Sequence, residues 1–263
     1  MRWRSVLFVP GHRPDLAAKA LRRGPDVVVL DLEDAVPVAA KEEARAAVGE
    51  GAAALAGRAP VCVRVNPVGS PWHAGDLAAL PRGVAAVVVP KWEAGIDIGH
   101  PVVAGLETVR GVADARTILG RHVVACYFGA EDFVADLGGV RTPGNLEVLH
   151  ARSSVAIAAR LAGIPALDMV TLDYRDGDRF TDEASGARAL GYAGKLCIHP
   201  DQVPLANAAF TPTDEEVDRA RRILAAYDAA GGAATSLDGE MVDEVIAVQA
   251  RSVLARAGST GGD

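Results

Sequence analysis

The chain has 263 residues, half of which are hydrophobic, and its 34 acidic against 27 basic residues give a net charge of -7. A chain of this length can bury one large core, and its acidic balance argues against nonspecific nucleic-acid binding. No segment reaches the roughly 20 apolar residues that a membrane span needs. These features predict a cytoplasmic protein with neither a membrane nor a nucleic-acid partner. Cys62, Cys126 and Cys197 lie in apolar runs without metal-type spacing, which predicts buried, reduced thiols.

Short apolar runs rich in Val, Ile and Leu alternate with longer segments rich in Ala, Arg and Glu. Most runs are continuously apolar, which is typical of parallel strands covered on both faces. Eight such runs favour a closed (β/α)8 barrel over an open doubly wound sheet, and no Gly-rich dinucleotide fingerprint follows the first run. The predicted strands are residues 5–9, 26–31, 60–65, 84–89, 102–106, 122–128, 166–172 and 195–198.

Helix signals fill the segments between these runs. Ala, Glu and Arg over residues 39–48 predict a helix that ends at Gly49. Apolar residues at helical spacing over 145–162 predict another helix, which ends at Gly163.

Additional helices follow the last predicted strand. Thr213 and Glu216 have the spacing of a capping box, in which the two residues satisfy each other's backbone N–H groups at a helix start. That helix is expected to end at Gly231-Gly232, and a final helix near Ala257. The predicted organisation is a barrel over residues 1–210, a C-terminal helical extension or lid over 211–258, and a disordered tail over 259–263.

Polar or charged residues stand at the C-terminal ends of most predicted strands. In a barrel these ends converge on one rim, where active sites are built. Charges at the edge of a core are unfavourable unless they are paired or bound to a metal, although strand ends are also solvated. The residues concerned are Asp31, Glu33, Asp34, Arg64, Asn66, Lys91, Glu107, Glu131, Asp132, Asp173, Lys195 and His199.

Glu107 and Asp132 are the candidate metal ligands, because they follow consecutive strands, which lie about 5 Å apart in a sheet. A divalent cation would relieve the repulsion between two such carboxylates, and Mg²⁺ prefers one or two carboxylates with water and substrate oxygens. The guanidinium of Arg64 suits an anion or an enolate. Alternatively, Arg64 forms a salt bridge with Glu33 or Asp34, and the two roles are compatible.

Eight motifs in consistent order, from residue 4 to about 250, resemble the citrate lyase β-subunit-like family, which is related to malyl-CoA and citramalyl-CoA lyases. The motifs are RSVLFVPG from Arg4, DLEDAV from Asp31, VRVN from Val63, PK from Pro90, ETVRG from Glu107, FGAEDF from Phe128, GKLCIHP from Gly194 and GEMVD from Gly239.

The resemblance implies an Mg²⁺ ion held by Glu107 and Asp132, and contact between Arg64 and the acyl substrate. It places Lys19 near coenzyme A or the substrate and implies a homotrimer or hexamer. It also assigns acid–base chemistry to Asp243, on a C-terminal segment often delivered by a neighbouring subunit. Without the resemblance, Asp243 has the character of a helix N-cap.

The predicted function is an Mg²⁺-dependent carbon–carbon lyase acting on a 3-hydroxyacyl-CoA, such as citramalyl-CoA or malyl-CoA, to give acetyl-CoA and a 2-oxo acid. Glu33 and Asp34 are expected to orient Arg64 and metal-bound water. Arg13 and Lys41 join Lys19 as candidates for the CoA phosphates, or all three are solvated charges. The alternatives are a β subunit that cleaves a carrier-bound citryl thioester, a CoA-independent 2-oxo acid aldolase, and a non-catalytic regulatory binder.

Overall fold

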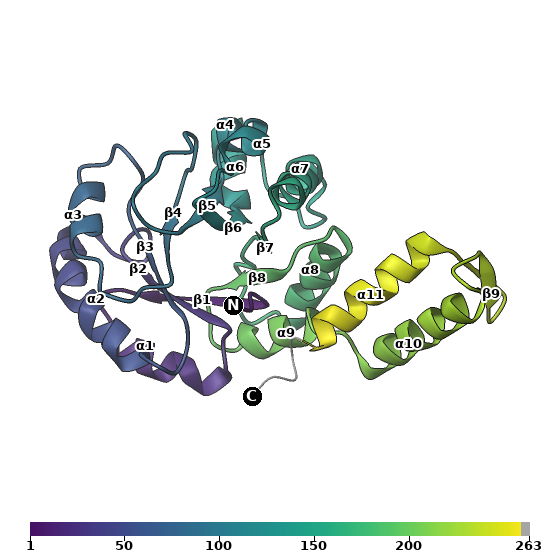
Figure 1. The fold of residues 1–263 in the computed structure, drawn as a ribbon. Coiled ribbons are helices and arrows are strands. Elements are labelled where there is room, and N and C mark those ends of the chain that lie inside the picture. Colours follow the sequence, from purple (N-terminus) through teal and green to yellow (C-terminus); the bar gives the residue numbers. More distant parts are fainter. Residues whose placement is uncertain (259–263) are drawn as a thin grey trace. The chain divides into compact units, whose positions relative to one another are not determined.

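The computed structural model describes residues 1–258, so the predicted disordered tail lies outside the described residues. The chain divides into two compact units, Met1–Asn207 and Ala208–Asp263. The first unit is a closed barrel of parallel strands surrounded by helices, as Figure 1 shows, and the predicted (β/α)8 fold is confirmed.

Each barrel strand pairs with the next in the chain, and β8 closes the barrel by pairing with β1. All eight predicted strands are present. The strand β7 is shorter than predicted, because its pairing to β8 ends at Asp168, and the carbonyl of Met169 accepts a hydrogen bond from Lys195 Nζ. The strands are β1 (Ser5–Pro10), β2 (Val27–Asp31), β3 (Val61–Arg64), β4 (Ala86–Val89), β5 (Val102–Leu106), β6 (Val123–Phe128), β7 (Ala166–Asp168) and β8 (Gly194–Cys197).

The barrel interior is a packed core, because alternate side chains along each strand point to the same face. The other set of side chains packs outward against the helices, which explains why the strands are apolar without a polar alternation. The inward cluster contains Val6, Val27, Val29, Cys62, Ala86, Val88, Val103, Ala125, Tyr127, Leu167 and Leu196.

The helices between successive strands lie on the outside of the barrel, and one more helix follows β8 (Figure 1). They are α1 (Pro14–Ala20), α2 (Lys41–Leu55), α3 (His73–Ala78), α4 (Val109–Ala113), α5 (Ala115–Ile118), α6 (Ala130–Leu137), α7 (Leu146–Ala162), α8 (Gly177–Ala189) and α9 (Gln202–Ala209), with 3-10 turns η1 (Leu21–Arg23) and η2 (Val38–Ala40).

Two predicted helix ends have different outcomes. Helix α7 ends at Gly163, whose left-handed φ of 71° closes the last turn as predicted. The predicted end of α2 at Gly49 is wrong, since the helix continues to Leu55. The second glycine of α2, Gly51, has a packing role. A Cβ there would lie only 3.3 Å from a methyl of Leu30, so the glycine lets α2 approach β2 closely.

The second unit is built from two helices and a hairpin. The predicted capping box of Thr213 and Glu216 is confirmed at the start of α10 (Asp214–Ala229). Sequence analysis did not predict the hairpin of β9 (Thr235–Leu237) and β10 (Glu240–Val242), which precedes α11 (Glu244–Gly258). Its turn residues Asp238 and Gly239 both have positive φ, as a two-residue hairpin turn of the I′ type requires.

The three cysteines are free thiols and buried, as predicted, and burial raises the pKa of each to about 12. Within residues 1–258, none of the helices has both the length and the apolar character that a membrane crossing requires.

Two glycine substitutions should have opposite effects on stability. Gly49→Ala in α2 meets open space and should raise the free energy of unfolding by about 0.5–1 kcal/mol, because alanine is the better helix former. Gly194→Ala should lower it by roughly 3 kcal/mol or more, since the new Cβ would lie 1.7 Å from the Trp3 carbonyl oxygen. Urea unfolding of both variants measures the difference. Equal stabilities would contradict the tight contact between β8 and the N-terminal segment.

Candidate active site

A cavity of about 450 Å³ opens at the C-terminal ends of the barrel strands. This is the rim on which (β/α)8 enzymes build their active sites. Its charged lining residues come from three separate strand ends and from α6. They are Asp31, Asp34, Arg64, Glu107, Glu131 and Asp132, and the apolar wall includes Phe8, Pro10, Val170, Leu172, Leu196 and Ile198.

The alternation of the barrel strands places three of these charges in the cavity. Asp31 continues the inward series of β2, Arg64 follows Cys62 on β3, and Glu107 follows β5 at the inward parity of Val103. The inward positions are apolar in the lower layers of the barrel and charged in the top layer. The alternation along these strands therefore gathers the charges, and the register shift between β5 and β6 lies at Val102, at the other end of β5 from Glu107.

The Arg64 guanidinium is bound by a fully buried carboxylate. Its Nε donates to Asp31 Oδ1 at 2.7 Å and its Nη2 to Asp31 Oδ2 at 2.6 Å. The two residues are direct neighbours in the register of β2 and β3. Burial alone would lower the pKa of Arg64, but Asp31 and Glu33 hold it well above its usual value. Sequence analysis placed Asp31 at this rim but did not identify it as the principal partner of Arg64.

Glu33 and Asp34 lie on the loop after β2 and also approach Arg64. Asp34, an exposed side chain, accepts a hydrogen bond from Arg64 Nη1 at 3.3 Å. Glu33 is buried, and its Oε2 lies 2.8 Å from the same nitrogen without a well-aligned hydrogen bond. Burial raises the pKa of Glu33 to about 8, and the Arg64 charge offsets only part of this effect.

Glu107 is 3% exposed, and burial together with the nearby Asp132 raises the pKa of its carboxyl group. Its Oε1 accepts a hydrogen bond of 2.8 Å from the backbone N–H of Lys91. A Cβ at Gly129 would lie 2.4 Å from Glu107 Oε2, so the glycine leaves room for the carboxylate. The hydroxyl of Tyr127, a further cavity-lining residue, is buried beside Glu107 without a well-aligned hydrogen bond.

Asp132 reaches the cavity from the first turn of α6, three residues beyond the helix cap Gly129, rather than from the end of β6 itself. The expectation that Asp132 stands at the end of the sixth strand is therefore wrong. The helix N-terminus favours a negative charge at this position. The Asp132 side chain is 40% exposed, and its Oδ1 lies 2.9 Å from the ammonium of Lys91.

The pair of Glu107 and Asp132 fits a magnesium ion better than a transition metal. Among residues 1–258, no three His, Cys, Asp or Glu side chains gather in a way that could hold a metal. Two carboxylates are nevertheless sufficient for Mg²⁺, which retains water and takes substrate oxygens. The raised pKa of Glu107, the proximity of Asp132 and the space that Gly129 leaves are consistent with such an ion.

Lys41 does not fit the predicted contact with a CoA phosphate, because its ammonium is buried and fully used. Its three hydrogens are donated to the carbonyl oxygens of Leu32 and Glu33, at 2.6 and 2.7 Å, and to Asn66 Oδ1 at 2.8 Å. Lys41 therefore fixes the loop after β2, which carries Glu33 and Asp34.

Lys19 and Arg13 are on the outside of the barrel and share one acidic partner. Lys19 Nζ lies 3.1 Å from Asp15, and Arg13 binds the same carboxylate through two nitrogens at 2.8 and 3.0 Å. The side chains are 56% and 49% exposed. Both basic groups are accessible to an anion.

Asp243 belongs to the second unit and caps α11. Its Oδ1 accepts a hydrogen bond of 3.0 Å from the backbone N–H of Ile246, as an N-cap residue does. The side chain is half-buried. The capping interpretation of the sequence is thus confirmed, and it leaves the second carboxylate oxygen for another role.

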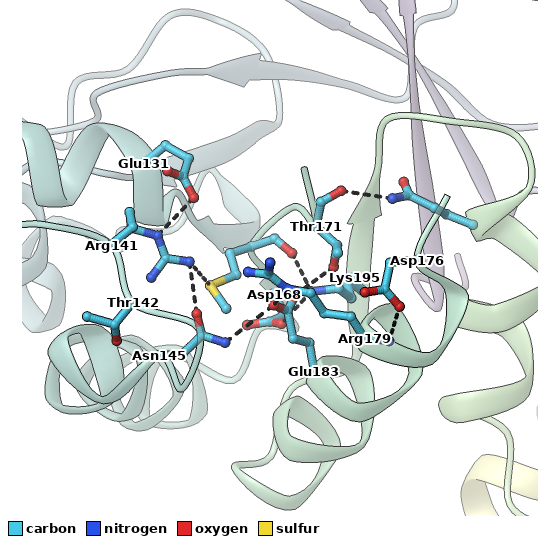
Figure 2. Close-up of polar contacts among 12 residues, drawn as sticks. Glu131, Arg141, Thr142, Asn145, Asp168, Thr171, Asp176, Arg179, Glu183 and Lys195 are labelled. Atoms are coloured by element: carbon cyan, nitrogen blue, oxygen red, sulfur yellow. Dashed lines mark hydrogen bonds and ion pairs between the residues drawn. The ribbon is translucent and has the colours of Figure 1, made fainter. Parts of the chain in front are cut away.

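The rim next to Asp132 is connected to α7 and α8 through Arg141. Figure 2 shows its guanidinium between Glu131, which it contacts at 2.9 Å, and Asn145, at 3.0 Å. Asn145 in turn donates to Glu183 Oε1 at 3.3 Å. Sequence analysis did not identify this chain of contacts, which holds the first turn of α6.

The network continues into a buried cluster that joins β7 and β8 to the helices α7 and α8 (Figure 2). Lys195 is completely buried, and its Nζ lies 3.0 Å from Asp168 and 3.4 Å from Glu183. Arg152 binds the same Asp168 through two nitrogens at 2.7 and 2.8 Å. Because Lys195 points outward while its neighbour Leu196 belongs to the barrel core, this lysine joins strands to helices and does not enter the cavity.

Glu33 should make the protein less stable as the pH rises. Its pKa is about 8 in the folded state, against an ordinary value of 4.5, so between these values the folded state retains a proton that the unfolded state has lost. The free energy of unfolding therefore falls across this range. With a chelator present, the wild type should lose on the order of a few kcal/mol more than Glu33→Gln between pH 5 and pH 8. Parallel pH profiles in urea unfolding would show that Glu33 is ionised throughout.

Comparisons with known proteins agree with this architecture. The citrate lyase subunit beta-like protein of Deinococcus radiodurans is 49% identical over 272 residues, which cover 95% of this chain and 96% of the relative. The citrate lyase subunit beta of Haemophilus influenzae is 35% identical, with 97% of both chains covered. The crystal structure of protein CitE from Mycobacterium tuberculosis in complex with magnesium, acetoacetate and coenzyme A has a TM-score of 0.87, 36% identity and 97% coverage of both chains.

The model of the HpcH/HpaI aldolase/citrate lyase family matches residues 4–100 and 98–200. The resemblance seen in the sequence is confirmed, and with it the prediction of a lyase-type enzyme at the level of the family. The chain belongs to the HpcH/HpaI aldolase/citrate lyase family.

Proposed function

We propose that this protein is a magnesium-dependent carbon–carbon lyase that cleaves a 3-hydroxyacyl-CoA, such as citramalyl-CoA or malyl-CoA, into acetyl-CoA and a 2-oxo acid. The observation that carries the proposal is that Arg64, Glu107 and Asp132 line the same cavity. Its volume of about 450 Å³ suits a small acyl group. The mycobacterial relative, whose structure holds magnesium, acetoacetate and coenzyme A, supports the same ligand classes here.

Glu107 and Asp132 would hold the ion, as two carboxylates at one rim. When bound, magnesium supplies a Lewis acid that lowers the pKa of the substrate hydroxyl and neutralises its carboxylate. Once the hydroxyl loses its proton to solvent or to a cavity carboxylate, the C2–C3 bond breaks. The electron pair of that bond passes to the thioester fragment, which leaves as an enolate, and the other fragment becomes the 2-oxo acid.

Arg64 stabilises the enolate in this proposal. Its Nε–H and one hydrogen of Nη2 are donated to Asp31, and one hydrogen of Nη1 is donated to Asp34. The second hydrogen of Nη2 can be donated to the thioester oxygen. The guanidinium is fixed before the substrate arrives, so little reorganisation is needed when charge develops on that oxygen. Glu33 and Asp34 orient the guanidinium in this proposal, and we expect them to order water on the ion when it is bound.

Asp243 completes the reaction by protonating the enolate carbon, or by removing that proton in the reverse direction. Lys19 and Arg13 are proposed to contact the CoA phosphates. These phosphates would replace Asp15 as the partner of both residues. A homotrimer or hexamer is part of the proposal, because the family resemblance implies that the acidic C-terminal segment comes from a neighbouring subunit. Light scattering of the purified protein tests the oligomeric state.

Two alternatives remain within the family. A citrate lyase β subunit would require a carrier-bound citryl thioester, and the relative from Haemophilus influenzae bears that subunit's name. A CoA-independent aldolase would act on free 2-oxo acids. Free CoA should inhibit the proposed enzyme competitively and should have no effect on a CoA-independent aldolase. The carrier-dependent subunit would release no product from citramalyl-CoA or malyl-CoA.

Glu107→Gln and Asp132→Asn should each reduce cleavage of citramalyl-CoA or malyl-CoA at least 100-fold, because either change removes one charge from the proposed ion site. Release of the 2-oxo acid is measured with and without magnesium, and circular dichroism controls for folding. Full activity of a folded variant, or of the wild type in excess chelator, would overturn the proposal. A folded wild type that cleaves no free thioester would favour the carrier-dependent alternative.

Asp243→Asn separates chemistry from helix capping, since asparagine caps a helix as well as aspartate does. The variant should keep its unfolding midpoint and its affinity for CoA in calorimetry, while kcat falls about 100-fold or more. Asp243→Ala is the matched control, which should also lose about 1 kcal/mol of stability with the cap. Unchanged turnover in Asp243→Asn would remove its acid–base role.

A further inference from the structure

Lys91 contacts all three buried or half-buried acids on its side of the cavity mouth. It follows β4 directly after Pro90. Its backbone N–H donates to Glu107 at 2.8 Å, whereas its ammonium lies 2.9 Å from Asp132 and 3.9 Å from Glu33. One residue thus supplies both a fixed hydrogen bond and a movable positive charge to this group of acids.

The backbone of Lys91 is held in an unfavourable conformation. Its φ of 50° lies in the left-handed region, which residues with a Cβ rarely adopt. The next residue, Trp92, stabilises it: the side chain is 1% exposed, its backbone N–H donates to Gly105 at 2.9 Å, and its indole N–H donates to Ile118 at 3.1 Å. A strained residue that its neighbours hold in place is a common feature of functional sites.

The lysine side chain is much less constrained than its backbone. It is 37% exposed, and its contact with Asp132 is a single ion pair between half-exposed groups. Burial lowers the pKa of Lys91, but the hydrogen bond to Asp132 and the charges of Asp132, Glu33 and Glu107 together outweigh this effect and raise it. A divalent cation held by Asp132 and Glu107 would need the carboxylate that this ammonium contacts and would repel it.

We propose that Lys91 is a resident counter-cation of the site, which neutralises Asp132 in the absence of magnesium and is displaced when the ion binds. This inference rests on the proposed metal site. Its consequence is that Lys91 stabilises the metal-free protein and weakens its affinity for Mg²⁺, whereas its backbone N–H keeps Glu107 in place in both states.

Lys91→Met tests the proposal, because methionine keeps the length of the side chain and removes the charge. The matched control is Arg82→Met, which makes the same change of net charge at an exposed position before β4, at the opposite end of the same strand. In calorimetric titrations with MgCl₂, Lys91→Met should bind about threefold to tenfold more tightly than the wild type, as expected for an exposed ion pair. Arg82→Met should bind as the wild type does.

Thermal unfolding supplies a second readout that does not depend on activity. The unfolding midpoint of Lys91→Met should lie below that of the wild type in chelator and approach it in saturating magnesium. Equal or weaker Mg²⁺ binding by Lys91→Met, or the same loss of midpoint in both conditions, would overturn the role of Lys91. If the wild type itself binds no Mg²⁺, the proposed metal site fails instead. Lys91→Gln provides a second variant should Lys91→Met fail to fold.

Discussion

The bidentate pair between Arg64 and Asp31 is the contact on which the cavity mouth depends. Asp31 is fully buried and accepts four hydrogen bonds, two from Arg64 and one each from the backbone N–H groups of Glu33 and Ala35. The same carboxylate therefore fixes the guanidinium and the start of the acidic loop. Lys41 holds this loop from its other side. Loss of either Asp31 or Arg64 would leave the charge of the other uncompensated, which is strongly destabilising.

The regular part of this structure follows from sequence periodicity. Eight apolar runs predict eight strands, and parity within each strand points Asp31, Arg64 and Glu107 into the same cavity. What periodicity does not contain is the partner of each charge across neighbouring strands, since the register of parallel strands depends on the whole barrel. The predicted ion pairs of Arg64 with Glu33 and Asp34 are present, and the adjacent strand position adds the bidentate partner Asp31.

Other features escaped prediction because one residue type serves several purposes. A glycine can end a helix or permit close packing, and Gly51 does the latter within α2, so the pattern around Gly49 was misleading. A lysine near an anionic site can bind substrate or hold the scaffold, and only its three buried acceptors reveal that Lys41 does the second. The Asp238-Gly239 pair was a readable turn signal, but the flanking strands have only three residues each.

The two cations of the mouth differ in a way that suits two tasks. The acids that contact Arg64 or Lys91 exceed these two cations by three negative charges when all are ionised, and a single divalent ion would balance two of the three. They are Asp31, Glu33, Asp34, Glu107 and Asp132. Burial raises the pKa of both glutamates, to about 8 for Glu33, and thereby disfavours their charged forms when no such ion is present. The planar guanidinium, gripped through two bonds by a buried partner, is suited to remain in place during a reaction. The ammonium has a flexible stem, one close contact to the half-exposed Asp132 and a longer one of 3.9 Å to Glu33, so it is suited to leave. An arginine at that position would not make the same exchange.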